Sequence, residues 1–319
     1  MLTDTFEVEI AAIRREADGI VGLDLVRPDG APLPRFEAGA HVEVHIGPSL
    51  VRQYSICNNP EETHRYRLAI LLESKSRGGS AAMHRDFAKG TRLLLTIPRN
   101  NFRLVESAKR SILLAGGIGV TPLLAMAYRL EATGRDFCLH YCARTQKNAA
   151  FVDLLTTSSF ADKVAFHFDD GPDEQRLPLD VLLTATDPGV HIYICGPAGF
   201  MDFVKVAANR HQWPDSQVHT EYFNAIIDIT GNQFDVKAAR SGVTVRVESK
   251  ESIVDALRRV AIEVNVSCEQ GVCGTCLTRV LQGIPDHRDL FQTDEEKSAN
   301  SHMTLCCSRA LTPEIVLDI

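Results

Sequence analysis

Three cysteines in one short, glycine-rich stretch are the residues of this chain most clearly suited to chemistry. Cys268, Cys273 and Cys276 follow a C-x4-C-x2-C spacing, and a fourth thiol, Cys306, comes after twenty-nine further residues. This spacing is typical of the plant-type loop that holds a [2Fe–2S] cluster, in which several thiolates converge on one inorganic core. Glycines at 271 and 274 suit such a tight wrap, because positive φ angles cost glycine little. The pattern therefore predicts an iron–sulfur centre.

A zinc site and a disulfide pair are the alternatives for these thiols. Zinc motifs more often pair two short C-x2–4-C units, and disulfides suit short secreted chains. The fourth ligand stays open between two adjacent residues, Cys306 and Cys307. Spacing favours Cys306, which would leave Cys307 as a small packing residue.

The composition is that of an ordinary globular protein with two or three domains. The chain has 319 residues, 45% of them hydrophobic and 24% charged, with a formal net charge of −7 and a pI near 5.9. The negative charge disfavours nucleic acid as a partner. We expect no membrane span, since the most apolar stretch, 112–124, is short and broken by glycine and proline. Nine cysteines without a signal peptide predict a reducing, cytoplasmic location, and a monomer is expected.

The first hundred residues have the pattern of short strands separated by turns. Apolar and polar residues come close to alternating, with turn residues such as Pro28-Asp29-Gly30 between the segments. The segments are 6–13, 20–26, 41–46, 65–72 and 92–97. This pattern predicts a small antiparallel β-barrel.

Two motifs in this region suit a ligand that carries both a phosphate and a planar ring. In Arg52-Gln53-Tyr54-Ser55, Arg52 and Tyr54 would share one face of a strand, while Ser55 points to the other. Arg77-Gly78-Gly79-Ser80 precedes a helical pattern at 81–87 and would offer an anion free N–H groups at a helix start. The alternatives are a packed tyrosine beside a surface arginine, and a serine N-cap after a flexible turn.

The middle of the chain alternates between strand and helix patterns. Strands are predicted at 111–115, 137–143, 163–168 and 190–195, which indicates an α/β doubly wound sheet. The first leads into Gly116-Gly117-Ile118-Gly119-Val120-Thr121-Pro122 and the last into Cys195-Gly196-Pro197. Such turns at the carboxyl ends of parallel strands suit a dinucleotide, although an ordinary tight βα turn would also explain each string.

Two further features refine the dinucleotide hypothesis. Asp169-Asp170-Gly171 ends a predicted strand, where carboxylates would bind an adenosine ribose and repel a 2′-phosphate, favouring NADH over NADPH. A plain Asp-Gly turn is the alternative. Tyr222-Phe223 closes this region, either as core aromatics or as a cover over a flavin ring.

The last ninety residues predict a mixed α+β frame around the cysteine loop. After a linker at 224–232, the pattern gives strands at 234–238, 243–248, 276–281 and 314–319 and helices at 252–260 and 293–300. Ser252 is the expected N-cap of the first helix. Asp294-Glu295-Glu296 is read as a solvated helix start, with a docking role as the alternative.

Together these segments resemble the phthalate dioxygenase reductase family, especially its vanillate O-demethylase reductase type, over nearly the whole chain. The markers are the five motifs above, in the order flavin, nicotinamide, ferredoxin. The resemblance implies an FMN-binding antiparallel β-barrel at 1–103, an NAD-binding α/β domain at 104–225, and a β-grasp, plant-type [2Fe–2S] ferredoxin domain at 233–319.

The resemblance also implies roles for individual residues. Arg52 would hold the FMN phosphate with Gly79 and Ser80, while Tyr54 and Ser55 would contact the isoalloxazine, Ser55 near N5. The nicotinamide site would be lined by Gly117, Thr121, Cys195, Gly196 and Pro197, and Phe223 would shield the flavin. Ser55, Cys195 and Phe223 would thus stand at the reacting atoms. FMN rather than FAD is an implication of the family alone.

We therefore hypothesise an NADH-dependent oxidoreductase that passes electrons from NADH through FMN and a [2Fe–2S] cluster to a Rieske-type aromatic dioxygenase or O-demethylase. One alternative is an electron-carrier module that does not itself oxidise NADH. Another is a self-contained oxygenase or nitric-oxide-detoxifying enzyme, but the sequence has no His-x-x-His motif with a nearby carboxylate for its iron.

Overall fold

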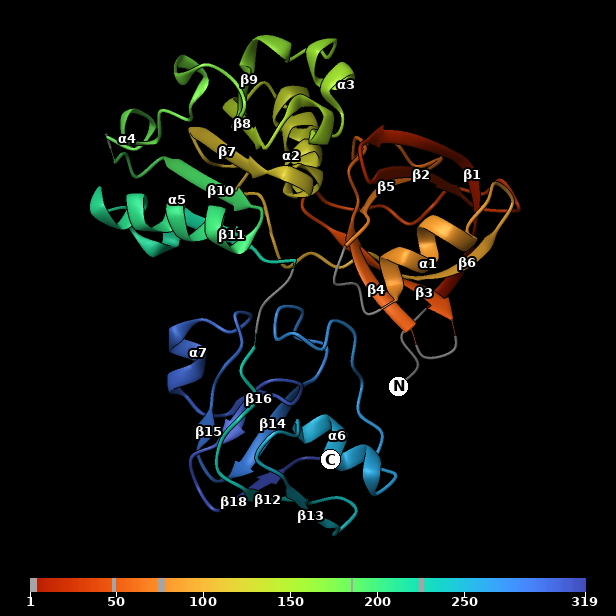
Figure 1. Ribbon diagram of the computed structural model, residues 1–319, viewed down its shortest axis with the longest axis vertical. Coiled ribbons are helices and arrows are strands. Elements are labelled where there is room, and N and C mark those ends of the chain that lie inside the picture. The colour runs from red at the N-terminus through yellow and green to blue at the C-terminus, as the bar shows by residue number, and fades with distance from the viewer. Residues whose placement is uncertain (1–4, 48–49, 74–77, 185, 224–226) are drawn as a thin grey trace. The chain divides into compact units, whose positions relative to one another are not determined.

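The computed structural model describes residues 5–47, 50–73, 78–184, 186–223 and 227–319 (Figure 1). The chain divides into two compact units, Met1–Phe223 and Asn224–Ile319. Residue 77 of the predicted anion site and residues 224–226 of the predicted linker lie outside the described residues. The division falls at the start of that linker, while the boundary between the first two predicted domains stays a prediction.

Six antiparallel strands form the first sheet of unit Met1–Phe223, and they run in the spatial order β4-β3-β6-β1-β2-β5. They are β1 (Thr5–Ala17), β2 (Ile20–Val26), β3 (His41–Gly47), β4 (Leu50–Ser55), β5 (Tyr66–Leu71) and β6 (Arg92–Thr96). The end strands β4 and β5 contact each other, so the sheet curls on itself as the predicted barrel requires. Alternate residues such as Val42 and Leu68 fill its core. Helix α1 (Gly79–Asp86) packs on β3, β4 and β5.

Five parallel strands form the second sheet of the same unit, in the order β11-β10-β7-β8-β9. They are β7 (Arg110–Gly116), β8 (Asp136–Ala143), β9 (Val164–Phe168), β10 (Val190–Cys195) and β11 (Val218–Glu221). Helices α2 (Val120–Ala132) and α3 (Val152–Thr156) share one core cluster with the sheet, and α4 (Leu179–Leu182) and α5 (Ala198–Arg210) share another.

This two-sided packing confirms the doubly wound prediction, and it shows where the strand order of the sheet reverses. The chain order reverses between the neighbouring strands β7 and β10, so their carboxyl ends form the topological switch point of the sheet. Ligands of open α/β sheets bind in the crevice at such a point. Both glycine-containing turns of the sequence analysis follow these two strands.

Unit Asn224–Ile319 is built on a mixed sheet in the order β13-β12-β18-β14-β16. Its strands are β12 (Phe234–Ala238), β13 (Thr244–Val247), β14 (Leu277–Gln282), β16 (His302–Thr304) and β18 (Glu314–Leu317). Helix α6 (Ile253–Arg259) packs its buried face into the sheet's core, and the Ser252 side chain accepts the Asp255 N–H as the predicted N-cap. The cysteine loop connects α6 to β14 (Figure 1).

The smallest elements of this unit were not predicted. These are β16 and the two-residue strands β15 (Pro285–Asp286) and β17 (Arg309–Ala310), which pair with each other. Two or three residues are too few to show a strand's alternation. Helix α7 (Asp294–Ser298) is shorter than predicted. Across the described residues, none of the helices is long and apolar enough for a membrane crossing.

Candidate functional site

The predicted phosphate site forms where β4 meets the first turn of α1. A Cβ placed on Gly79 would lie 2.8 Å from the Arg52 Cγ and 2.9 Å from its Nε. Glycine therefore lets the arginine side chain lie directly against the start of the helix. The N-cap, Gly78, has a φ of 94°, which a residue with a side chain adopts only with strain. A guanidinium and a helix N-terminus thus meet at one corner, an arrangement suited to an anion.

Ser80 has a different local role from the N-cap considered in the sequence analysis. Helix α1 begins at Gly79, so Ser80 lies inside its first turn, and the N-cap interpretation is wrong. The side chain is buried, and its Oγ accepts the backbone N–H of Glu73 at 3.2 Å. This hydrogen bond ties the end of the preceding segment to the helix start.

Tyr54 and Ser55 point to opposite sides of β4, as predicted. Tyr54 packs against the barrel core, and burial raises the pKa of its hydroxyl to about 12, with the Arg52 charge opposing that rise. Ser55 is buried and its Oγ donates to Glu221 Oε2 at 3.4 Å, which is long for an O–H···O hydrogen bond. This contact joins the barrel to β11 of the parallel sheet.

Glu221 is the site residue to which the sequence analysis gave no role. Burial of its carboxyl group raises its pKa to about 8, and the Ser55 hydrogen bond only partly opposes this. At neutral pH the group is therefore mostly protonated, an unusual state for a glutamate. Its sequence neighbours, Thr220 and Tyr222, gave no sign of this, and its hydrogen-bond partner Ser55 lies 166 residues away in the sequence.

Cys195 stands beside Glu221 at the end of the neighbouring strand. The two residues pair in the parallel register of β10 and β11. Cys195 is fully buried, and burial together with the Glu221 carboxyl raises the pKa of its thiol well above the usual range. The thiol is therefore protonated at neutral pH. A protonated, buried thiol is a poor nucleophile, since the thiolate is the reactive form.

Glycines let the two turns at the switch point pack against each other. A Cβ on Gly119 would lie 2.2 Å from the Cys195 carbonyl oxygen, and one on Gly196 would lie 2.9 Å from the Gly116 Cα. Neither position has room for a side chain. Helix α5 begins directly after Pro197, so its N-terminus also faces this point. The two predicted dinucleotide turns, after β7 and after β10, are therefore in direct contact with each other.

The remaining predicted nucleotide residues lie at or near this edge of the sheet. Gly117 has a φ of 53°, and Thr121 Oγ1 donates to the Ile118 carbonyl oxygen at 3.0 Å, which fixes the turn between them. Asp169 is exposed directly after β9, two strands away from β7. Phe223 is half-buried and packs against the core that α2 shares with the sheet.

The cysteine loop brings its thiols together in a buried cluster. Cys268, Cys273, Cys276 and Cys306 are all at most 9% exposed. Hydrogen bonds from the Cys273 and Cys306 side chains lower the pKa of the Cys268 thiol and raise the pKa of the two donor thiols. Backbone N–H groups also point at sulfur: Gln270 N lies 3.3 Å from the Cys268 Sγ, and Thr275 N lies 3.5 Å from the Cys273 Sγ. Such donors stabilise thiolates that bind a cluster.

The two loop glycines take the positive φ angles predicted for them, 67° at Gly271 and 71° at Gly274. A Cβ on Gly274 would lie 2.3 Å from the Phe291 ring, and one on Gly271 would lie 2.6 Å from the Cys307 Sγ. Both positions therefore need glycine for space as well as for conformation. No three His, Cys, Asp or Glu side chains in the described part of the chain fit a site for a single metal ion. The fit to a cluster rests on thiol spacing, burial and N–H donors.

The surroundings of the two adjacent cysteines differ. The Cys306 side chain contacts those of Cys268 and Cys276. Cys307 is buried as well, and its side chain contacts that of Cys306 while its Sγ lies 3.0 Å from Thr304 Oγ1. This arrangement supports Cys306 as the fourth ligand, as the spacing predicts, and Cys307 as a packing residue.

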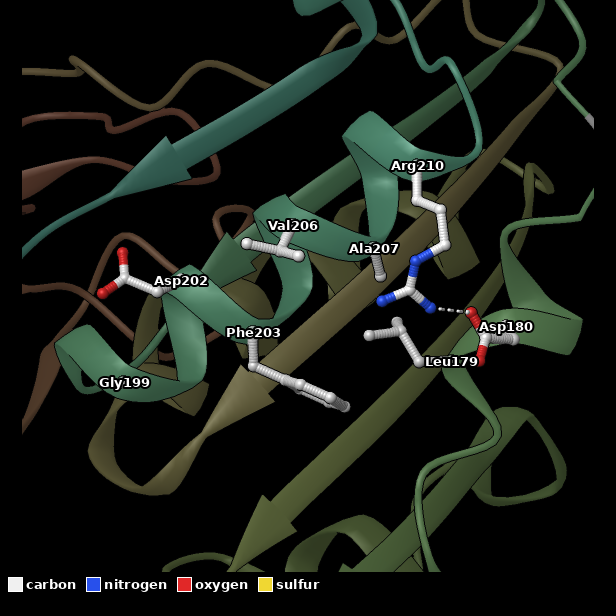
Figure 2. Close-up of a pocket in the computed structure, with 8 residues that line it drawn as sticks. All are labelled: Leu179, Asp180, Gly199, Asp202, Phe203, Val206, Ala207 and Arg210. Atoms are coloured by element: carbon white, nitrogen blue, oxygen red, sulfur yellow. Dashed lines mark hydrogen bonds and ion pairs between the residues drawn. The ribbon is translucent and has the colours of Figure 1, made fainter.

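A separate groove lies between α4 and α5 and contains none of the predicted site residues (Figure 2). Phe203 and Val206 of α5 line it together with Leu179 of α4. At one end, Arg210 Nη1 donates to Asp180 Oδ1 at 3.1 Å. The groove is thus an apolar surface feature bordered by an ion pair.

Comparisons with known proteins agree with this arrangement. Residues 236–311 match the family described as the 2Fe-2S iron-sulfur cluster binding domain. The vanillate O-demethylase oxidoreductase of Pseudomonas sp. (strain HR199 / DSM 7063) is 47% identical over 315 residues, which cover 98% of this chain and 99% of that protein.

Among the solved structures that resemble the whole chain are the following two. One is a phthalate dioxygenase reductase whose structure is described as modular for electron transfer from pyridine nucleotides to [2Fe–2S]. It has a TM-score of 0.76 and 37% identity, and the match covers 99% of this chain and 98% of that one. The other is an intact type IV self-sufficient cytochrome P450 monooxygenase, with a TM-score of 0.86 and 35% identity. This chain spans 41% of its length.

Proposed function

This chain belongs to the phthalate dioxygenase reductase family, and from that premise we propose that it delivers electrons from NADH to a Rieske-type oxygenase that demethylates or dioxygenates an aromatic compound. It is an oxidoreductase of the class that serves oxygenase systems. The observation that carries the proposal is the contact of Ser55 with Glu221. It joins the flavin side of the barrel to the nucleotide side of the parallel sheet, on one chain with the cysteine loop.

When bound, FMN would supply two-electron exchange with NADH and one-electron exchange with the [2Fe–2S] cluster, which would supply one-electron transfer. The protein's own residues bind and orient these groups. In our proposal Arg52 and the N–H groups at Gly79 hold the flavin phosphate. Tyr54 and Ser55 contact the flavin ring, and Phe223 covers it. The four cysteines hold the cluster.

The turns at the switch point would hold the nicotinamide. In our proposal Gly117, Thr121, Gly196 and Pro197 shape its pocket, and Cys195 forms a small neutral wall of that pocket. Glu221 would hold the Ser55 hydroxyl in place. Because its carboxyl is protonated at neutral pH, Glu221 would add no negative charge where hydride leaves the nicotinamide ring. Asp169 would bind the adenosine ribose.

The proposal that the partner is an aromatic O-demethylase is carried by the whole-length likeness to the vanillate O-demethylase oxidoreductase. A haem-containing oxygenase is a second candidate partner, because the self-sufficient P450 contains a region similar to this chain. The two differ in the redox centre that receives the electron, not in the chemistry of this chain.

Anaerobic mixing with NADH tests the proposal. We expect flavin and cluster absorbance to bleach together within seconds, and NADPH at the same concentration to act more slowly. An unchanged spectrum would mean that the chain is an electron-carrier module that does not oxidise NADH. Adding vanillate O-demethylase oxygenase with vanillate, or a P450 domain with its substrate, then distinguishes the two partners by which one turns over.

A further inference from the structure

A groove beside the cysteine loop has no part in the chemistry described so far. It has a volume of about 290 Å³, and its lining includes Leu277, Gln292, Glu295, Glu296, Ser301 and His302. Leu277 directly follows Cys276, so the groove begins one residue from a proposed cluster ligand. Its volume lies just below the range of pockets that enclose a drug-sized ligand. The groove is therefore suited to one protruding side chain.

Beside the Ser301 hydroxyl and the His302 ring, this groove carries three acceptor side chains, those of Gln292, Glu295 and Glu296. Gln292 is only 7% exposed, and its Nε2 donates to the His302 carbonyl oxygen at 3.3 Å. Its Oε1 is buried and has no hydrogen-bond partner in the described structure. Glu296 closes the helix cap, accepting the Thr293 N–H at 2.8 Å. Glu295 takes no part in that cap and is exposed.

The positive charge closest in sequence does not neutralise these acids. Lys297 turns its Nζ to the Asp289 carbonyl oxygen at 2.8 Å. A groove with an unpaired carbonyl oxygen and carboxylates at its rim favours a cationic side chain with several N–H donors, which means lysine or arginine.

Two exposed leucines flank the cysteine loop. Leu277 is 37% exposed and Leu290 is 48% exposed. Leu290 is held in place, because its N–H donates to the Gly271 carbonyl oxygen at 2.9 Å. The next two N–H groups, of Phe291 and Gln292, donate to Asp289 Oδ2 at 3.2 and 2.7 Å. A fixed apolar contact beside acidic groups is typical of a protein interface with an electrostatic rim.

We propose that the groove and these two leucines, together the cluster-side face, form the surface on which the oxygenase component docks. The groove takes a lysine or arginine side chain from the oxygenase, and Leu277 and Leu290 contact apolar residues around it. This inference rests on the proposed function and names the partner surface. Docking here brings the oxygenase within one residue of Cys276, so an electron leaves the cluster without crossing the body of the unit.

Charge reversal at the groove tests the electrostatic part of this proposal. The probe is vanillate O-demethylase oxygenase with vanillate, assayed at low salt with the intact holoprotein. We expect Glu295→Lys to raise the KM for the oxygenase about tenfold, because like charges would meet at the interface. The matched control is Glu314→Lys. Glu314 is also exposed but begins β18 beyond the Gln282 end of β14, which is the end away from Cys276.

Salt separates the two kinds of contact. The Glu295→Lys effect should shrink toward wild type as ionic strength rises, since the Debye length falls from about 10 Å at 0.1 M to about 3 Å at 1 M. A Leu290→Ser variant should raise the same KM severalfold at every ionic strength, because it removes apolar contact. Equal effects of the Glu295 and Glu314 reversals, or no effect of either, would overturn the proposal.

Two further measurements distinguish failure of the docking proposal from failure of the proposed NADH-dependent reductase function. The rate at which NADH bleaches the cluster in a single turnover should be the same in Glu295→Lys and in wild type. A slower rate in the variant would assign the cluster-side face to electron entry from the flavin and overturn the docking proposal. If wild type oxidises NADH with a dye but never reduces the oxygenase, the docking proposal falls while the NADH reductase assignment stands.

Discussion

The two electron-handling regions of this chain are built on opposite plans. The flavin–nicotinamide region is assembled from distant segments, since Ser55 and Glu221 meet across 166 positions of sequence. The cysteine loop takes three of its four proposed ligands from nine consecutive residues, with Cys306 added from the end of β16. One region depends on two sheets packing correctly, whereas the other depends mainly on local backbone conformation.

This difference has an energetic counterpart. The flavin–nicotinamide region keeps its central groups neutral, because burial raises the pKa of both Glu221 and Cys195. The cysteine loop is organised to hold negative charge, with backbone N–H groups directed at sulfur. A neutral pocket suits hydride exchange between two bound rings, while a loop rich in donors suits thiolates around a metal cluster. Substitutions in the two regions should therefore impair different properties of the protein.

Loss of one ligand thiol should have the largest effect, because it should abolish the function of the cysteine loop and spare that of the flavin–nicotinamide region. We expect Cys273→Ser to abolish the cluster and electron delivery to an oxygenase, while NADH-to-dye reduction through the flavin continues. Cys307→Ser is the matched control, because this buried thiol lies 3.0 Å from Thr304 Oγ1 and is not one of the four proposed ligands. Iron and acid-labile sulfide content, together with dye reduction, measure both. Loss of the cluster in Cys307→Ser would indicate that Cys307, not Cys306, is the fourth ligand.

Removing the Arg52 guanidinium from the proposed phosphate site should weaken flavin binding and leave the cysteine loop unaffected. A hydrogen bond to a charged group is worth about 1.5–3 kcal/mol, so Arg52→Ala should weaken flavin binding by about 10- to 100-fold. Cluster content should not change. The control is Arg92→Ala, since Arg92 is exposed on the barrel and pairs with Glu7. Ultrafiltration with flavin fluorescence gives the dissociation constants. Undiminished flavin binding in Arg52→Ala would remove this residue from the phosphate site.

The buried carboxyl of Glu221 should give the flavin–nicotinamide region a pH dependence of stability. The folded pKa of about 8 lies above the ordinary 4.5, so between these values the unfolded chain releases a proton that the folded chain keeps. Stability then falls as pH rises through this window, by up to about 1.4 kcal/mol per pH unit. Below 4.5 the contribution is fully present, and above 8 the loss is complete.

Glu221→Gln removes this titration and keeps the shape of the side chain. Urea unfolding at pH 5 and pH 8 should show a smaller loss of stability in the variant than in wild type. Parallel losses in the two proteins would mean that Glu221 ionises normally in the folded chain. Unchanged NADH-to-dye turnover in the variant at pH 7 would further show that a neutral group is sufficient at this position.

The contrast between the regions also explains what could be predicted from sequence. The thiol spacing, the glycines at 271 and 274, and long strands such as β2 and β12 are local patterns, and the structure agrees with them. Glu221 and the packing of Gly119 on Cys195 arise only when separate segments meet. The same is true of the cluster-side face, whose groove joins α7 to the start of β14. The alternative interpretation of Ser80 as an N-cap is wrong because Gly78, in a left-handed conformation, starts the helix earlier.

The weakest effect is expected at the exposed edge of the nucleotide site. Asp169→Asn should raise the ratio of kcat/KM for NADPH to that for NADH about fivefold, because two charges 4 Å apart in water interact by about 1 kcal/mol. Asp162→Asn is the control, since Asp162 is equally exposed but precedes β9 at the opposite end of the strand. Steady-state dye reduction with each nucleotide gives the ratios. If both variants shift the ratio equally, the general negative charge of the protein rather than a ribose contact determines the nucleotide preference. The exposed carboxylate of Asp169 would then contribute nothing specific to the choice between NADH and NADPH.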